Sequence, residues 1–221
     1  RIFSEVDHQL IAHCEDEGTI RANLDHYLAG VGEAGLTPAY HPLIRSEEAC
    51  WKSSSAAVAL ARKAGARFHV YHLSTGIEVQ LCGKHLPVEH EKIPAEACIH
   101  HLWFTDADYA TKQNFIKWNP AVKTEADRAA LRAGLLDGSI DVIATDHAPH
   151  TLEEKMATYS KAPSGGPLAQ HAVVAVLELV RKGVLPLERA VELMCHRPAI
   201  LCGVEDRGFL REGYFADLVV V

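Results

Sequence analysis

The chain has 221 residues, of which 48% are hydrophobic, so it is long enough to bury one sizeable core. Its formal charge is -7, with 29 acidic residues against 22 lysines and arginines, and no basic stripe is present to meet a phosphate backbone. No apolar run approaches the roughly 20 residues that cross a bilayer, and the N-terminus lacks a signal-peptide pattern. We therefore expect a cytoplasmic protein that binds neither nucleic acid nor a membrane.

Four short apolar segments predict buried strands in chain order: 10–15, 67–73, 96–104 and 141–147. Helical patterns lie between and after them, at 50–65, 124–138, 170–183 and 186–203. Thr124 and Asp127 have the spacing of a capping box, while Gly65 and Gly138 stand where helices end. Pro186 suits a first helical turn, and Pro198 predicts a break.

Strands and helices thus alternate over most of the chain, which favours a parallel α/β architecture. A barrel and an open sheet both fit this pattern. The segment 208–221 is different because it contains a turn at Gly213 followed by a β-rich run. A loop at 159–170 contains a Gly-Gly-Pro sequence, which suggests backbone close to a functional site.

Three of the four predicted strands end in a side chain that can bind a metal: His13, His72 and Asp146. The carboxyl ends of the strands in a parallel barrel emerge on one face, so these residues can converge there. Imidazole and carboxylate groups suit zinc in a catalytic site that keeps one position for water. A single histidine at a strand end is more often a hydrogen-bonded structural residue, and Asp146 could instead cap a helix.

Two adjacent histidines, His100 and His101, fall in the predicted strand 96–104. Successive side chains of a strand point to opposite faces. At most one of this pair is therefore expected to face a site.

A series of motifs in one order carries a family resemblance: "HCED" (13–16), "HLST" (72–75), "AEACIHHL" (95–102), "KWNP" (117–120), "ATDHAPH" (144–150) and "GYFADLVVV" (213–221). The chain resembles the C-terminal half of the dihydroorotase family, within the cyclic amidohydrolases. The resemblance implies an α/β fold, a partial metal-dependent (β/α)8 barrel of about strands 5 to 8. Residues 1–207 would form this half-barrel, and 208–221 would be a β-segment of a small composite β-sandwich domain.

The resemblance also implies a binuclear zinc site in the complete enzyme. His13 and His72 would bind the second metal, while Asp146 would bind the first metal and act as catalytic acid and base. The family's H-x-H-x-R motif and its bridging lysine belong to the N-terminal half and are absent from this chain. We therefore expect the isolated chain to be inactive.

Four further positions match residues that hold the substrate in this family. Asn119 and His150 would bind it, with His150 directed at its carboxylate. Ser164 and Gly165 would contact the pyrimidine ring through their backbone, although "APSGGP" departs from the usual spelling of that loop. The resemblance implies reversible hydrolysis of dihydroorotate to N-carbamoyl-aspartate in pyrimidine (UMP) biosynthesis.

Two alternatives remain open. One is another cyclic amidohydrolase, such as a dihydropyrimidinase, hydantoinase or allantoinase, which would use the same metals on a different ring. The other is a non-catalytic dihydroorotase-like chain that serves as a structural partner. Self-association into a homo-oligomer is left open as well.

Overall fold

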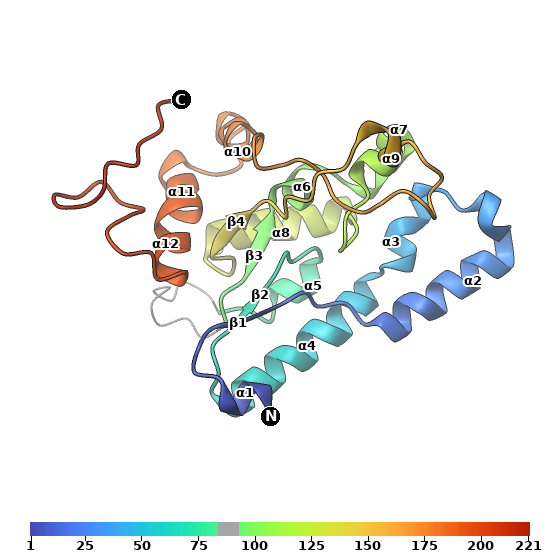
Figure 1. The fold of residues 1–221 in the computed structure, drawn as a ribbon, viewed down its shortest axis with the longest axis horizontal. Helices are drawn as coiled ribbons and strands as arrows, with labels where there is room; N and C mark the ends of the chain where they lie inside the picture. The colour runs from blue at the N-terminus through green and yellow to red at the C-terminus, as the bar shows by residue number, and fades with distance from the viewer. Residues whose placement is uncertain (84–92) are drawn as a thin grey trace.

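Four parallel strands form the centre of the computed structural model, which describes residues 1–83 and 93–221 (Figure 1). They are β1 (Leu10–Ala12), β2 (Phe68–Val70), β3 (Glu96–Cys98) and β4 (Val142–Ala144). β1 pairs with β2, and β3 pairs with β4. A bridge from Val70 to Ala95 joins the two pairs, so the strands stand side by side in chain order.

Each strand lies inside a segment that the sequence predicted, and a helix or helices separate it from the next. The helices are α1 (Ile2–Glu5), α2 (Glu17–Gly35), α3 (His41–Ile44), α4 (Glu47–Ala64), α5 (Gly76–Val79), α6 (Ile99–Trp103), α7 (Tyr109–Lys112), α8 (Glu125–Asp137), α9 (Leu152–Lys155), α10 (Ala172–Arg181), α11 (Leu187–Val191) and α12 (Arg197–Leu201). This alternation confirms the parallel α/β class. The assignment of the four strands to positions 5 to 8 of a barrel stays a prediction.

Helix α8 begins and ends at the predicted signals, whereas α4 ends at the predicted Gly65 but begins at Glu47, three residues before the predicted start. The Thr124 side chain accepts a hydrogen bond from Asp127 N, and the Asp127 carboxylate accepts one from Thr124 N, which completes the capping box of α8. Gly138 ends this helix with a φ of 82°, and Gly65 ends α4 with a φ of 68°. Both angles favour glycine because it has no Cβ.

The predicted strand 96–104 is wrong beyond Cys98. The chain turns there into the short helix α6, which carries both His100 and His101. The expectation that these two rings face opposite sides is therefore wrong as well. Both histidines are buried in the helix, and their ring centroids lie only 4.1 Å apart.

The tail predicted to be β-rich contains no strand within residues 208–221. Its apolar side chains are exposed, with Leu210 at 84% and Val220 at 98%. Figure 1 shows this red segment extending away from α11 and α12. A strand requires a hydrogen-bonded neighbour, and the described residues offer none to this segment.

The sequence predicted a helix break at Pro198, and this prediction is wrong. A π-helical turn at Glu192–His196 precedes it and leads directly into α12. A proline cannot donate to the preceding turn and its ring crowds the carbonyl there. The wider π turn relieves this conflict, so the helix continues.

Helix α2 was missed by the sequence analysis. It begins at the N-cap Asp16, whose side chain accepts a hydrogen bond from Thr19 N, and it contains a kink at Gly32. Only Ile20 is buried along its length, which explains why no clear apolar stripe marks it. With α3, it packs against Tyr159 of the loop between α9 and α10.

The main core lies between the strands and the helices that cover them. Phe68 and Val70 of β2 pack with Val58 and Ala61 of α4, all almost fully buried, and α8 and α10 add further apolar side chains to the same cluster. The core therefore fixes the strands, and the strands position the residues that follow them. No helix among the described residues is long and apolar enough to span a membrane.

Two neighbouring leucines of α8 test this packing. Leu135 is fully buried, whereas Leu136 is 51% exposed. We expect Leu135→Ala to lower the free energy of unfolding by about 2–5 kcal/mol through lost burial and cavity formation. Leu136→Ala should change it by no more than about 0.5 kcal/mol. Urea unfolding of both variants measures this, and equal losses would contradict the packing of α8.

Candidate metal and substrate site

The predicted metal ligands lie where the strands end. His13 directly follows β1, while His72 and Asp146 each come two residues after their strands. His72 has a φ of 34° and Asp146 a φ of 47°, values that few residues other than glycine adopt. Such backbone strain persists only where the surrounding structure holds it, and it is concentrated at functional sites. Both side chains are thus held in unusual positions at the same edge of the strands.

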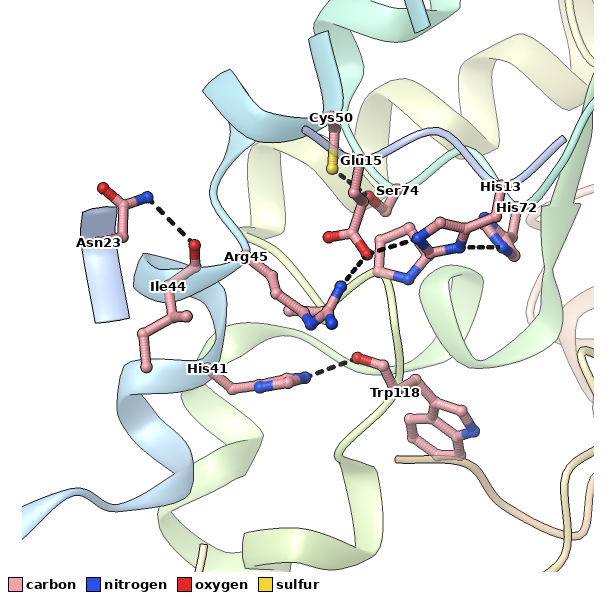
Figure 2. Close-up of polar contacts among 12 residues, drawn as sticks. His13, Glu15, Asn23, His41, Ile44, Arg45, Cys50, His72, Ser74 and Trp118 are labelled. Carbon is pink, nitrogen blue, oxygen red and sulfur yellow. Dashed lines mark hydrogen bonds and ion pairs between the residues drawn. The ribbon is translucent and has the colours of Figure 1, made fainter. Parts of the chain in front are cut away.

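His13 and His72 face each other directly. The Nδ1 atom of His13 lies 3.0 Å from Nε2 of His72, and Figure 2 shows the two rings converging. Burial, and then the neighbouring His13, lower the pKa of His72 to about 4, so its ring is neutral at pH 7. Neutral imidazole is the form that binds a metal.

The spacing of these two nitrogens fits a shared metal ion. Two nitrogen ligands of a tetrahedral zinc ion, with bonds of about 2.0–2.1 Å, lie about 3.3 Å apart. The observed separation of 3.0 Å is close to this value.

A buried ion pair orients His13. Its Nε2 atom lies 3.0 Å from the Glu15 carboxylate, which also binds the Arg45 guanidinium (Figure 2). Burial alone would raise the pKa of Glu15, but the hydrogen bond from His13 and the charge of Arg45 outweigh it and lower that pKa. An ionised Glu15 accepts the hydrogen bond of an Nε2–H of His13, which turns Nδ1 of that ring towards His72.

Glu96 supports His72 from the neighbouring strand. Its Oε1 atom accepts a hydrogen bond of 3.3 Å from the backbone N–H of His72, and its Oε2 atom lies 3.1 Å from Nε2 of His69. The sequence analysis missed both Glu15 and Glu96. An acidic residue at the start of an otherwise apolar strand was the signal that could have identified Glu96.

Asp146 lies outside the histidine pair. No three histidine, cysteine, aspartate or glutamate side chains come together as a metal cluster within residues 1–83 and 93–221. Although Asp146 is largely exposed, partial desolvation of its carboxyl group and the charge of Glu96 raise its pKa. The structure therefore brings together two of the three predicted ligands, and the metal-binding and catalytic roles remain predictions.

The predicted substrate residues come from three loops that contact one another. Nε2 of His150 lies 3.1 Å from the Ser164 carbonyl oxygen, and Gly165 N donates to the Lys117 carbonyl at 2.8 Å. Asn119 and Ser164 line one cavity of about 400 Å³. The Oδ1 atom of Asn119 is buried without a hydrogen-bond partner among the described residues, so it can accept one from a ligand.

Two buried lysines hold the loop that contains Ser164 and Gly165. Nζ of Lys155 donates to the carbonyl oxygens of Pro163 at 3.0 Å and Gly165 at 2.8 Å. Nζ of Lys117 donates to the Tyr159 carbonyl at 2.7 Å. Burial lowers the pKa of each lysine to about 8. Sequence reasoning missed them because nothing local distinguishes them from exposed lysines.

His41 connects this loop to the segment that carries Asn119. Burial lowers the pKa of His41 to about 3, so the ring is neutral. Its Nε2 atom lies 2.7 Å from the Trp118 carbonyl oxygen (Figure 2), and its Nδ1 atom lies 2.9 Å from the Tyr159 hydroxyl. A carbonyl only accepts, so Nε2 carries the proton and Nδ1 accepts from the hydroxyl. The two substrate loops are therefore fixed relative to each other.

Gly165 provides a test of this loop geometry. Its φ is 131°, and an added Cβ would lie 2.6 Å from the Ala148 carbonyl oxygen. We expect Gly165→Ala to lower the free energy of unfolding by about 1–3 kcal/mol because both backbone strain and overpacking act there. Gly30→Ala is the control, since a Cβ at Gly30 meets nothing within 4 Å. Chemical unfolding of the two variants measures the difference, and a fully stable Gly165→Ala would contradict the close contact.

Comparison with known sequences places the chain among amidohydrolases. A model of the amidohydrolase family matches residues 4–221. A dihydroorotase from Bacillus cereus (strain B4264) is 34% identical over 99% of this chain and 49% of its own length. A dihydroorotase from Pelotomaculum thermopropionicum is 35% identical over 96% of this chain and 48% of its own length. The chain thus spans about half the length of the curated relatives it matches.

Solved structures show the same architecture. The L-hydantoinase (dihydropyrimidinase) from Arthrobacter aurescens superposes with a TM-score of 0.87 at 26% identity, covering 97% of this chain and 49% of that protein. A dihydroorotase from Saccharomyces cerevisiae in complex with 5-fluoroorotic acid gives a TM-score of 0.65 at 18% identity, covering 72% and 44%. The second likeness shows the fold alone.

Proposed function

The chain belongs to the amidohydrolase family, and we propose that it is part of a zinc-dependent dihydroorotase. The observation that carries this proposal is the pair of histidine nitrogens 3.0 Å apart at the strand ends, with the backbone of His72 in the left-handed region. The sequence similarity to dihydroorotases over 99% of the chain supports the substrate class.

His13 and His72 would hold one zinc ion of a binuclear site, and Asp146 would bind the other. Bound zinc lowers the pKa of water towards neutrality and polarises a carbonyl oxygen. The His13 ring is oriented for this role by the ionised Glu15, which is itself held by Arg45. His72 is neutral at pH 7, so one of its two ring nitrogens carries a lone pair that a metal would bind.

Asp146 would move the proton of the reaction. As water attacks the ring carbonyl, the Asp146 carboxylate accepts the proton of the nucleophile and then delivers it to the departing ring nitrogen. Partial desolvation and the charge of Glu96 raise the pKa of Asp146, which brings the proton affinity of the carboxylate closer to that needed for both steps. In the reverse direction, the same group serves closure of N-carbamoyl-aspartate to dihydroorotate in pyrimidine biosynthesis.

The substrate would be held by the three loops that carry Asn119, His150 and Ser164 and that contact one another. His150 would bind the ring carboxylate, and Asn119 would contact the ring through its amide. Backbone groups of Ser164 and Gly165 would complete the contacts, in a loop that Lys155 fixes through two of its carbonyl oxygens. This arrangement selects a small cyclic amide that carries a carboxylate.

A second candidate function is hydrolysis of an uncarboxylated ring. The TM-score of 0.87 to an L-hydantoinase (dihydropyrimidinase) at 26% identity favours this alternative. A third candidate, a non-catalytic structural partner, predicts loss of ligand residues. His13, His72 and Asp146 are all present, which argues against that candidate.

Replacing the proposed acid and base gives the direct test of the mechanism. In an active preparation that contains this chain, we expect Asp146→Asn to reduce turnover of dihydroorotate by at least about 100-fold, because the amide cannot transfer the proton. The fold should be retained, since Asp146 is largely exposed. Ultraviolet absorbance follows ring opening, and circular dichroism follows the fold. Unchanged turnover would remove Asp146 from the mechanism.

His150 tests the proposed substrate. We expect His150→Asn to lower kcat/KM for dihydroorotate by about tenfold or more, the loss typical of a charge-assisted hydrogen bond, while activity on uncarboxylated rings changes little. Dihydroorotate, dihydrouracil, hydantoin and allantoin should be compared in the wild type and the variant. A wild type that prefers hydantoin, with equal losses on every ring, would support the hydantoinase alternative instead.

A further inference from the structure

A second cavity, of about 370 Å³, lies between α6, α8 and α10, and none of its lining residues belongs to the metal and substrate site. Four cationic side chains line it, and only one carboxylate does so. The cations are Lys112 at the end of α7, Arg128 and Arg132 of α8, and Lys182 after α10, and the carboxylate is Asp108. The chain as a whole carries a net charge of -7, so this concentration of positive charge opposes the average.

The two arginines are fixed in place. Nε and Nη2 of Arg132 donate to the Leu102 carbonyl oxygen at 2.9 and 2.7 Å, and Nη1 of Arg128 donates to the Trp103 carbonyl at 2.6 Å. The arginines stand on successive turns of α8. Burial, and then the charge of Arg128, lower the pKa of Arg132. Two guanidinium groups are therefore held close together despite their repulsion.

The carboxylates nearby pair with only two of the four cations. Glu125 pairs with Arg128, and Glu178 lies 3.5 Å from Nζ of Lys182 while also binding Arg181. Within the described residues, neither Arg132 nor Lys112 has a carboxylate within ion-pair distance. The Nη1 atom of Arg132 also makes no hydrogen bond to that part of the chain. Arg132 and Lys112 thus make no direct ion pair, although the charge of Glu125 still acts on Arg132.

The carboxylate that lines the cavity is already engaged. Oδ2 of Asp108 accepts hydrogen bonds from the backbone N–H of Thr105 at 2.8 Å and from its hydroxyl at 3.3 Å. This pair forms a capping box that explains the position of Asp108 without reference to the cations. Asp108 keeps its negative charge, so the lining of the cavity holds four cations against one anion.

Capping of the last carbonyls of α6 accounts for the positions of Arg128 and Arg132. It does not account for Lys112 and Lys182, which reach the same cavity from two other elements. Nζ of Lys182 lies 4.6 Å from the centre of the Trp103 ring, which forms part of the wall. The cations thus surround the space from three elements, an arrangement that suits a tetrahedral anion with several oxygens better than a planar carboxylate.

We propose that this cavity binds a phosphate group of a small molecule, at a site separate from the strand-end histidines. The guanidinium of Arg132 supplies directed hydrogen bonds, and Lys112 and Lys182 supply charge. Binding would neutralise the repulsion within the cluster. The proposal is independent of the activity proposed above.

Calorimetric titration of the 221-residue chain at constant ionic strength tests the site. The probes are inorganic phosphate, pyrophosphate and a nucleoside triphosphate, which distinguish a free phosphate from a phosphate ester, and succinate serves as the carboxylate comparison. We expect saturable binding of at least one phosphate probe and weaker binding of succinate. Binding should also change the fluorescence of Trp103, and this change should be absent in Trp103→Phe. No saturable binding of any phosphate probe would overturn the proposal.

Charge-removing variants locate the binding. Arg132→Gln should weaken it by about tenfold or more, as expected for loss of a charge-assisted hydrogen bond. Arg21→Gln, at an exposed arginine of α2, removes the same charge elsewhere and should leave binding unchanged. Equal losses in both variants would indicate a general charge effect and overturn the site.

Arg132 also holds α6, so Arg132→Gln could fail to fold. Lys112→Gln is a second variant that removes a charge from the cavity without touching that contact. Lys112 is exposed, so its substitution leaves the fold intact, and circular dichroism verifies this in each variant. We expect Lys112→Gln to weaken phosphate binding several-fold. If Arg132→Gln does not fold, this variant decides the question, and unchanged binding by Lys112→Gln would overturn the proposal.

Discussion

The hydrogen-bonded register of the parallel strands is the constraint on which the candidate site depends. Leu10 pairs with Phe68 and Glu96 pairs with Val142, and the bridge from Val70 joins the two pairs. Because the strands run in the same direction, the residues that follow them emerge at one edge. His13 and His72 therefore come together although they lie 59 residues apart in sequence.

Buried polar contacts then convert this common edge into an oriented site. Glu15 fixes the tautomer of His13, and Glu96 accepts from the backbone of His72. On the substrate side, Lys155 and His41 hold the loops in which the proposed binding residues lie. Each of these groups is buried, so its hydrogen bonds are strong and any loss of a partner leaves an expensive unsatisfied group.

Much of this arrangement could be predicted from sequence because the relevant signals are local. The apolar run before Asp146 and the capping residues of α8 act within a few positions, and they predicted a strand and a helix correctly. The helix at His100 could not be predicted, because its apolar neighbours fit a strand equally well and tertiary packing decided between them. The partners Glu15 and Arg45 lie 30 residues apart, so only the folded structure reveals their pairing.

The central claim is that His13 and His72 share one metal ion. Calorimetric titration of the 221-residue chain with zinc tests this and requires no enzymatic activity. We expect His13→Ala and His72→Ala each to weaken zinc binding by at least about 100-fold, more than the loss typical of a residue that only hydrogen-bonds to a metal ligand. His26→Ala, at an exposed histidine of α2, should have no effect. Equal zinc affinity in all three variants and the wild type would contradict it.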